Sequence, residues 1–323
     1  MKKLLSMMLT LVLVLGMSTA AFATDYDNYL DKKPVVPKTY EVKNGTAPAE
    51  TFTFKFEGVS YKNGDGNVVE NATIPAISNV TTSFDALTAT AAKTAEASID
   101  ADQYELGVYT YKVTEVVPAT KTAGVTYSDE ALYLVLSIVR DENSGKHYVA
   151  AMHYQDAAGT DKTTGFTNKY DAGSLTVGKK IEGNMADMNK KFAFTITFAA
   201  PAGTEIKSTI ASNSTAGTWS DDGLTYTISL GHNETVTLSN IPAGTTYTVS
   251  EDAANYTSDN GVYSDSTKTI SGGDQDTVTF TNTLTNAIDT GIGLDSLPYI
   301  LLLVVVCAGL VAFVSKKRMM REN

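Results

Sequence analysis

Three residue types that can react with one another recur as a set in this 323-residue sequence. Lys38 precedes an aromatic segment, Glu115 ends a Tyr-rich segment, and Asn168 ends the segment Phe-Thr-Asn. A deprotonated lysine amine is a nucleophile, an asparagine amide is an acyl group with ammonia as its leaving group, and a protonated glutamate can polarise a carbonyl and shuttle protons. Held in contact, the three groups can form a Lys–Asn isopeptide bond, driven by effective molarity rather than by an external enzyme.

A second set follows in the same order along the chain. Lys179 precedes the segment Phe-Ala-Phe-Thr-Ile-Thr-Phe, Glu251 ends Tyr-Thr-Val-Ser-Glu, and Asn282 ends another Phe-Thr-Asn. The two lysines are 179 − 38 = 141 residues apart, which is a common domain length. The repeat therefore predicts two domains of similar construction, each with one Lys, one Glu and one Asn.

Each of these residues falls in the apolar row of its segment, because every second side chain of a strand points to the same face. Lys38 aligns with Val36 and Tyr40, whereas Lys180, the neighbour of Lys179, falls on the opposite face. Burial disfavours an unpaired ammonium or carboxylate, so the pKa values shift until both groups are neutral and reactive. Alternatively, each Lys and Glu reaches solvent at a strand end and forms an ordinary ion pair; the recurrence in both copies favours burial.

The elements that position these sets are predicted to be β-strands. Short segments alternate apolar residues with Thr or Lys, and turns rich in Gly, Asp and Asn separate them, as at 63–66. The pattern indicates an all-β fold of two tandem sandwiches, over residues 34–171 and 172–285. The Ala- and Thr-rich range 84–102 fits either a helical turn or a long crossing loop.

The two ends of the chain have the composition of targeting segments. Residues 1–23 combine a cationic start, an apolar core and the motif Ala-Phe-Ala, which predicts a signal peptide, followed by an N-terminal tail at 24–33. Residues 297–314 carry no charge and precede a cluster of Lys and Arg, so the range 292–323 is predicted to hold a transmembrane helix and a cationic tail. A buried helix of a soluble domain is the alternative for that segment. Together the two ends predict an exported chain.

Composition argues against several function classes. The formal net charge is −11 and no basic patch is visible, which argues against nucleic-acid binding. One Cys and three scattered His provide neither a disulfide nor a Cys/His site, so we expect no metal and no cofactor. A surface hydrolase would need a nucleophile or a carboxylate pair in a cleft, and no such motif appears outside the Lys/Glu/Asn sets. We therefore expect a structural protein, not an enzyme, whose chemistry is limited to self-processing.

With these motifs the sequence resembles the sortase-assembled backbone (major) pilins of Gram-positive bacteria, in particular the streptococcal two-domain type with pilin isopeptide-linker repeats. The similarity lies in Pro-Lys-Thr-Tyr at 37–40, Val-Thr-Glu at 113–115, Leu-Thr-Val-Gly-Lys-Lys at 175–180 and the two Phe-Thr-Asn segments. It implies Ig-like, CnaB-related sandwiches. The bonded pairs and catalytic carboxylates that it implies are Lys38 with Asn168 beside Glu115, and Lys179 with Asn282 beside Glu251.

In that family a sortase signal precedes the C-terminal helix. The corresponding stretch here, within residues 286–291, is Ala-Ile-Asp-Thr-Gly; it keeps the Thr290–Gly291 bond that a sortase cleaves but lacks the usual Leu-Pro, which leaves the class of sortase open. The resemblance also implies a lysine that accepts Thr290 of the next subunit, and its place late in the first domain indicates Lys162. A solvated loop charge is the other interpretation of Lys162. The alternative acceptors are two nearby lysines, Lys146 and Lys169.

The resemblance implies a structural shaft subunit of a covalently polymerised cell-surface pilus, attached to the cell wall of a Gram-positive bacterium. Its expected partners are a sortase, other copies of itself, accessory pilins, and the membrane before sorting. The alternative is a wall-anchored monomeric adhesin or a minor pilin, for which we would expect an additional ligand-binding domain that the sequence does not show.

Overall fold

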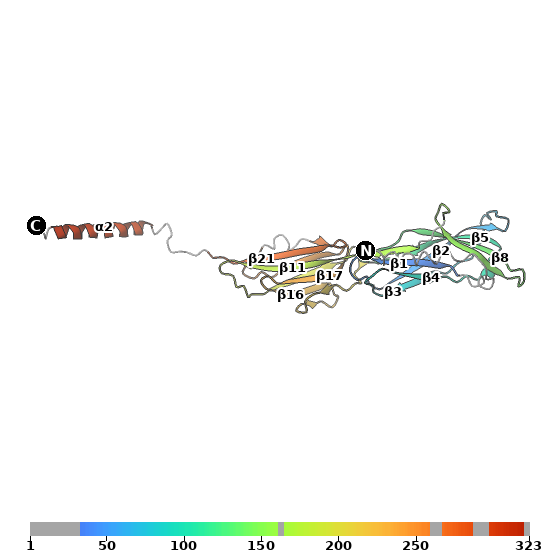
Figure 1. The fold of residues 1–323 in the computed structure, drawn as a ribbon, viewed down its shortest axis with the longest axis horizontal. Coiled ribbons are helices and arrows are strands. Elements are labelled where there is room, and N and C mark those ends of the chain that lie inside the picture. Colours follow the sequence, from blue (N-terminus) through green and yellow to red (C-terminus); the bar gives the residue numbers. More distant parts are fainter. Residues whose placement is uncertain (1–32, 161–164, 259–266, 287–296, 320–323) are drawn as a thin grey trace, which may run out of the picture.

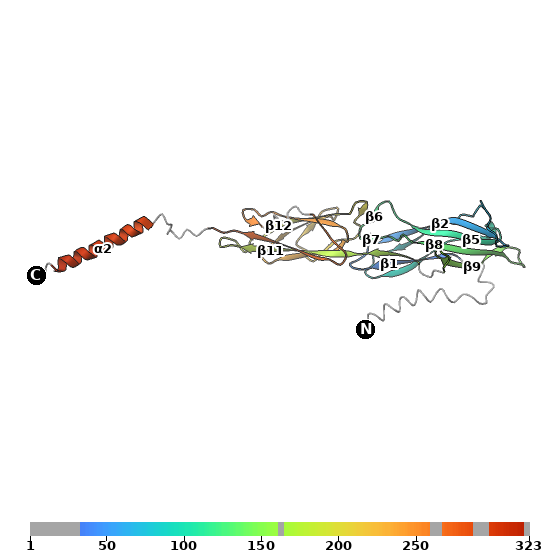
Figure 2. The ribbon, with the colours of Figure 1, turned by 90° about the horizontal axis from the view of Figure 1, so that it is seen from above.

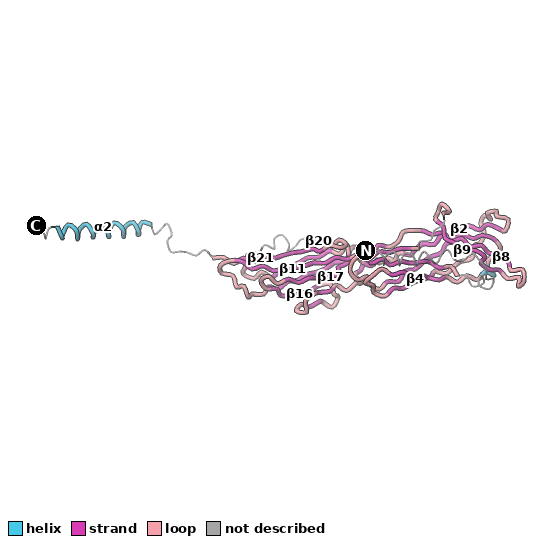
Figure 3. The backbone as a smooth tube through the Cα atoms, viewed as in Figure 1, coloured by secondary structure: helices cyan, strands magenta, loops and turns pink. Residues whose placement is uncertain are grey.

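The computed structural model describes residues 33–160, 165–258, 267–286 and 297–319. Strands dominate these residues and form two β-sandwiches that lie one after the other along the long axis of the molecule (Figure 1, Figure 2). Figure 3 shows the same path by type of secondary structure, with strands throughout both domains and a helix after the second. The prediction of an all-β fold with two tandem sandwiches is confirmed.

The first domain packs a four-stranded sheet against a five-stranded sheet. Its strands are β1 (Val35–Val42), β2 (Glu50–Asn63), β3 (Val80–Phe84), β4 (Ala91–Glu96), β5 (Gly107–Val116), β7 (Val125–Thr126), β8 (Ala131–Arg140), β9 (His147–Gln155) and β10 (Phe166–Tyr170). The strand orders are β4-β1-β10-β7 and β3-β2-β5-β8-β9. Alternate side chains point inward along the strands, as in β2, where Phe52, Phe54 and Phe56 are buried.

The second domain packs two five-stranded sheets. Its strands are β11 (Ala172–Glu182), β12 (Phe192–Ala199), β14 (Ala211–Ser212), β15 (Thr218–Trp219), β16 (Thr225–Leu230), β17 (Thr235–Pro242), β18 (Thr246–Glu251), β19 (Thr257–Ser258), β20 (Lys268–Thr269) and β21 (Gln275–Thr283). The strand orders are β14-β17-β11-β21-β19 and β15-β16-β12-β18-β20. Its core is separate from that of the first domain.

The first and last strands of each domain are parallel neighbours. β1 pairs with β10 in the register that aligns Lys38 with Phe166, and β11 pairs with β21 in the register that aligns Lys179 with Phe280. In both domains the lysine therefore lies opposite the residue two positions before the asparagine of the Phe-Thr-Asn segment. Because the strand period is two, lysine and asparagine face the same core in each domain. The two domains thus share the register of their first and last strands as well as the order of their motifs.

The range 84–102 holds the helical turn that was one of the two expectations, and also a strand that neither expectation included. The turn is the short 3₁₀-helix η2 (Ala101–Gln103) at the end of the range, and the strand is the edge strand β4, which pairs antiparallel with β1. Most side chains of β4 are exposed or half-buried, and its sequence Ala-Ala-Lys-Thr-Ala-Glu has no apolar alternation. The strand is therefore held by its backbone pairing with β1, which a hydrophobic pattern does not reveal.

Backbone contacts join the two domains closely. One residue, Asp171, separates β10 from β11. The short strands β6 (Lys121–Thr122) and β13 (Thr204–Glu205) pair in parallel, one from each domain. Asn240 of the second domain, which has a left-handed φ of 60°, accepts a hydrogen bond at 2.8 Å from the backbone N–H of Thr46 in the first. No long linker separates the domains.

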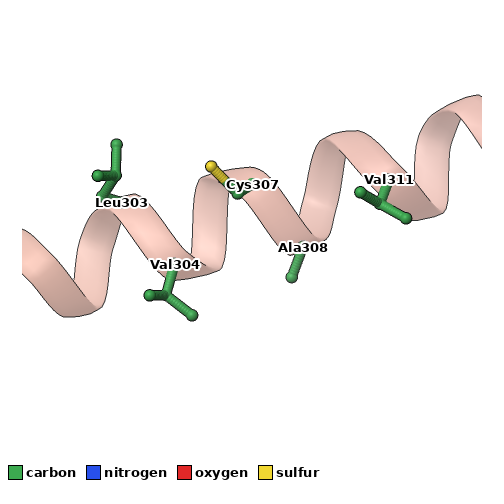
Figure 4. A pocket seen from close by; sticks show the side chains of 5 residues that line it. All are labelled: Leu303, Val304, Cys307, Ala308 and Val311. Atoms are coloured by element: carbon green, nitrogen blue, oxygen red, sulfur yellow. The ribbon is translucent and has the colours of Figure 1, made fainter.

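A helix, α2 (Leu297–Met319), follows the second domain and extends away from it in both views (Figure 1, Figure 2). Figure 4 shows five of its side chains, which line a hollow along the helix: Leu303, Val304, Cys307, Ala308 and Val311. A helix is thus present at the predicted place. In the part of the chain that the structure describes, however, no helix combines the length and apolar composition that crossing a membrane requires, so the transmembrane prediction is not confirmed.

Candidate functional site

In the first domain the predicted set of three side chains meets in the core between the two sheets. Lys38 comes from β1, Glu115 from β5 and Asn168 from β10. The Lys38 Nζ atom lies 2.5 Å from Glu115 Oε2, and Asn168 Nδ2 donates a hydrogen bond of 2.5 Å to Glu115 Oε1. The side chains of Lys38 and Glu115 are 0% and 1% exposed, and Asn168 is fully buried. One buried carboxylate therefore contacts both the amine and the amide.

Apolar surroundings act on the Lys38 amine. Its Nζ atom lies 4.2 Å from the centre of the Phe52 ring. Desolvation lowers the pKa of Lys38 to about 8, although its hydrogen bond and charge interaction with Glu115 act in the opposite direction. With this pKa about a tenth of the amine is neutral at pH 7, far more than for an exposed lysine. Burial thus makes the Lys38 amine the nucleophile that the sequence predicts.

The Asn168 carbonyl has a different partner from the one expected. Its Oδ1 atom accepts a hydrogen bond of 2.8 Å from the backbone N–H of Ser128, and Glu115 contacts the amide nitrogen instead. The orientation of the amide is determined by these two partners, because a flipped amide would bring its NH₂ group against another N–H donor and its oxygen against a carboxylate. The carboxylate that was expected to polarise the carbonyl therefore faces the leaving group.

The second domain repeats the arrangement with small differences. Lys179 from β11 has its Nζ atom 2.7 Å from Glu251 Oε1 on β18, and Asn282 Nδ2 on β21 donates to the same oxygen at 3.1 Å. The side chains of Lys179 and Glu251 are both 0% exposed. The Lys179 amine also donates to the Phe280 carbonyl at 3.3 Å and lies 4.6 Å from the centre of the Phe192 ring. Both domains thus place an amine, a carboxylate and an amide together in an apolar core.

The carbonyl of the second amide is surrounded differently. Among the described residues, no donor contacts the buried Oδ1 atom of Asn282. Ser258, which pairs with Asn282 between β19 and β21, instead donates its hydroxyl to Glu251 Oε2 at 3.3 Å. The carboxylates and amines of the two domains are therefore equivalent, and the contacts around the two asparagines are not.

The other lysines singled out by the sequence lie on the surface or outside the described residues. Lys180 points away from the core, with a half-exposed side chain paired to Glu182, as its parity predicts. Lys146 is exposed in the turn between β8 and β9, and Lys169 is exposed on β10. The expected acceptor Lys162, the expected cleavage site Thr290–Gly291 and the predicted signal peptide lie outside the described residues.

Sequence reasoning missed three participants. Ser128 contributes through its backbone, so no side-chain pattern could identify it. Phe52 and Phe192, whose rings lie near the two lysine amines, did have a signal. Each is the first aromatic residue of the aromatic strand in its copy of the repeat, so alignment of the copies pairs them.

The family comparisons agree with this geometry. Residues 34–171 match the family model of the Spy0128-like isopeptide containing domain, FctA. Residues 173–284 match a second model, DUF7601, which is described as a domain of unknown function. The first of the two buried Lys/Glu/Asn sets therefore lies in the range that matches a domain family described as isopeptide containing.

Relatives and solved structures extend the similarity to both domains. The chain is 29% identical over 310 residues to a pilin of Streptococcus pyogenes serotype M1, covering 88% of this chain and 91% of that pilin. A variant of the major pilin of Streptococcus pyogenes has a similar structure, with a TM-score of 0.53 and 26% identity over 79% of this chain and 100% of the other. The fold of a major pilin from serotype GAS13637 is also similar, with a TM-score of 0.53, 22% identity and coverage of 78% and 98%.

Two β-sandwiches in series, with the first and last strands of each brought together at a Lys/Glu/Asn set, define a pilin of the isopeptide-containing class. The chain is similar over both domains to the two-domain major pilins of Streptococcus pyogenes, and it is a structural subunit of the shaft of a cell-surface pilus in a Gram-positive bacterium. The similarity to a pilin and to a major pilin over both domains favours this function over that of an adhesin.

Proposed function

We propose that the shaft subunit closes two intramolecular isopeptide bonds by itself, one from Lys38 to Asn168 and the other from Lys179 to Asn282. The observation that carries the proposal is the shared carboxylate. In each core a single buried glutamate contacts both the lysine amine and the nitrogen that must leave. A carboxylate in this position can take a proton from the amine and deliver one to the leaving group.

The reaction balances without any co-reactant. Glu115 takes one proton from the Lys38 ammonium, and the lone pair of the resulting amine attacks Asn168 Cγ while the carbonyl electrons move to Oδ1. A proton from the attacking nitrogen passes through the carboxyl to Nδ2, the oxygen electrons re-form the carbonyl, and ammonia leaves. The products are a secondary amide, ammonia and a protonated glutamate. Of the five protons on the starting ammonium and amide nitrogens, one stays on the new amide, three leave in ammonia and one remains on the glutamate. Glu251 has the same role for Lys179 and Asn282.

An intact-mass measurement tests the two bonds. Purified residues 24–285 should be lighter than the sequence mass by two ammonia losses, about 34 Da in total. Glu115→Ala should remove one loss and Glu251→Ala the other, because each carboxyl serves its own domain. Glu57→Ala, on the exposed face of β2, is the control and should retain both losses. A wild-type protein at the unmodified mass would refute the proposal.

Polymerisation is the second part of the proposed function. We propose that a sortase cleaves Thr290–Gly291 and that Lys162 of a neighbouring copy attacks the resulting Thr290 acyl-enzyme. The same chemistry then joins the shaft to accessory pilins and to the cell wall. Support comes from the sequence around the cleavage site and from the similarity to streptococcal major pilins over both domains.

Lys162→Arg tests the acceptor, since arginine keeps the charge but is not a usable nucleophile at neutral pH. Wall extracts of cells producing wild-type protein should show a high-mass ladder after boiling in SDS, and Lys162→Arg should reduce it to monomer while both ammonia losses persist. Lys146→Arg and Lys169→Arg are the matched controls and should leave the ladder unchanged. A ladder that survives in Lys162→Arg but disappears in one of these two would transfer the role to that lysine.

A further inference from the structure

We infer that the backbone N–H of Ser128 is a catalytic group of the first domain, which stabilises the negative charge that develops on Asn168 Oδ1 when the isopeptide bond forms. The inference rests on the proposed Lys38–Asn168 bond. In this mechanism one protein group acts on the carbonyl oxygen of the Asn168 amide and a different group acts on its leaving nitrogen.

The position of Ser128 follows from strand pairing. β7 runs antiparallel to β10, with Val125 opposite Tyr170 and Thr126 opposite Lys169. Two residues after Thr126, the backbone N–H of Ser128 lies 2.8 Å from Asn168 Oδ1, and both residues are buried. Among the described residues, this N–H donates to Asn168 Oδ1, which belongs to the reacting amide.

Neighbouring contacts hold the donor in place. The Ser128 hydroxyl accepts a hydrogen bond from the Glu130 N–H at 3.4 Å, and the Tyr127 hydroxyl accepts one from the Thr122 N–H at 3.2 Å. The segment that follows β7 is thus attached on both sides of the Ser128 N–H. A preorganised donor in a site without water stabilises developing charge more than a solvent-exposed donor does, because it need not reorient.

The two contacts of the amide separate its two functions. Glu115 lies on Nδ2, where a proton must arrive before ammonia leaves, and the Ser128 N–H lies on Oδ1, where the carbonyl electrons accumulate after Lys38 attacks Cγ. The hydrogen bond to Oδ1 becomes charge-assisted in the tetrahedral intermediate and is therefore stronger there than in the starting amide. When the intermediate collapses, those electrons re-form the carbonyl and the hydrogen bond returns to its neutral strength.

The second domain provides an internal reference within the same chain. Its core is separate from that of the first domain, and Ser128 contacts none of the second set of reacting residues. The rate of forming Lys179–Asn282 should therefore not depend on residue 128. The rate of forming the first-domain bond is therefore divided by the rate of forming the second-domain bond in the same chain. This ratio does not depend on how much of each variant is synthesised.

Three changes at residue 128 test the inference in residues 24–285, synthesised in a cell-free system and quenched with acid at intervals. Ser128→Ala keeps the N–H and removes the hydroxyl. Ser128→Pro removes the N–H. Replacement of residue 128 by its α-hydroxy acid analogue exchanges the N–H for an ester oxygen and leaves the chain flexible at φ. Each crosslink is followed by the mass of its crosslinked peptide pair after digestion.

We expect the first-domain rate, relative to the second, to fall on the order of 10²–10³ fold in the proline and ester variants, which is the range found when one oxyanion donor is removed. Ser128→Ala should lower the ratio much less than either of these variants, because its backbone donor is intact and only the hydroxyl contact with the Glu130 N–H is lost. If proline prevents the first domain from folding, as circular dichroism would reveal, the ester variant decides. A folded ester variant with the wild-type ratio would overturn the inference and leave the two bonds intact. A wild-type chain with neither bond would instead overturn the proposed function.

Discussion

At the scale of single residues, burial and Glu115 have opposite effects on the pKa of the Lys38 amine. The apolar surroundings favour the neutral form, whereas the carboxylate 2.5 Å away favours the ammonium. Desolvation has the larger effect, because the pKa of Lys38 falls to about 8. Before the bond forms, the first domain therefore contains a lysine that is less basic in the folded chain than in the unfolded chain.

This difference predicts how the unreacted domain responds to pH. Asn168→Ala provides the unreacted state, since it removes the acyl group and leaves Lys38 beside Glu115. Between the folded pKa of about 8 and the unfolded value of 10.5, the unfolded chain binds more protons, so stability should rise as the pH increases through that window and be flat below it. The free energy of unfolding in urea, measured at intervals of pH, gives the slope.

A triple variant isolates the contribution of the lysine. Asn168→Ala combined with Lys38→Met and Glu115→Gln lacks both ionisable groups and reports all other titrations, including those of the buried tyrosines. Relative to the triple variant, the single variant should become more stable to unfolding as the pH rises from about 8 to about 9.5. A difference that stays constant, or changes in the other direction, would contradict a lowered pKa for Lys38.

Parity along the strands was enough to predict the buried lysines, glutamates and asparagines. Lys38 and Lys179 occupy apolar rows, and a polar residue in such a row that recurs in a repeat is informative. The Ser128 contact was beyond prediction, because a backbone donor leaves no trace in the identity of its residue. The orientation of the Asn168 amide, which reverses the expected role of Glu115, depends on that donor and was unpredictable for the same reason.

At the scale of elements, the parallel pairing of first and last strands brings lysine and asparagine together. In the first domain this pairing begins where Gly165 lies against β1. A Cβ atom at Gly165 would overlap the backbone carbonyl of Pro37, immediately before Lys38. Glycine is therefore required here for close approach of the two strands, and the approach sets the distance between the reacting side chains.

Gly165→Ala should consequently separate β1 from β10 at the site. We expect a loss of about 1–3 kcal/mol in the stability of the first domain, as for other overpacked positions, and a lower yield of the first ammonia loss. The second ammonia loss should be unaffected. Urea unfolding and intact mass measure the two effects.

Gly64→Ala is the matched control, because no atom lies within 4 Å of the added Cβ and its φ is not left-handed. It should leave the stability of the first domain and both ammonia losses at wild-type levels. Complete bond formation in Gly165→Ala would show that strand spacing at this point does not control the reaction.

Long strands with a hydrophobic period were predictable, and short ones were not. The aromatic strands β2 and β12 and the Tyr-rich strands β5 and β18 all follow the alternation seen in the sequence. The two-residue strands β6 and β13, which pair across the domain junction, are too short to have any period. Their pairing arises from the way the two folded domains meet, which local sequence does not specify.

At the scale of the whole molecule, the two domains lie in series, and each proposed bond joins the first strand of a domain to its last (Figure 1). Tension that enters near Lys38 would pass through the bond to Asn168, along the short connection to Lys179, and through the second bond to Asn282. With both bonds closed, the residues between the bonded pairs would not carry the load. A closed loop of 168 − 38 = 130 residues also stabilises the fold by about 4–5 kcal/mol in chain-entropy models.

Force spectroscopy on residues 24–285, pulled from both ends, tests this arrangement. The wild-type fragment should show no unfolding extension before the attachment fails, because covalent bonds span both domains. Glu115→Ala combined with Glu251→Ala should show two domain-sized steps, and either substitution alone should show one. Domain-sized steps in the wild type would mean that the bonds are absent or join other residues.

The connection between the two ends of each sandwich also changes what a protease can achieve. Exposed turns are the usual sites of proteolytic cleavage, and the turn at 63–66 between β2 and β3 is of this kind. Once Lys38 is bonded to Asn168, a cut at that turn opens a ring but releases no fragment, because each piece stays attached through the side-chain bond. A pilus built from such subunits can be cut once within the ring of every subunit and still remain a single covalent molecule.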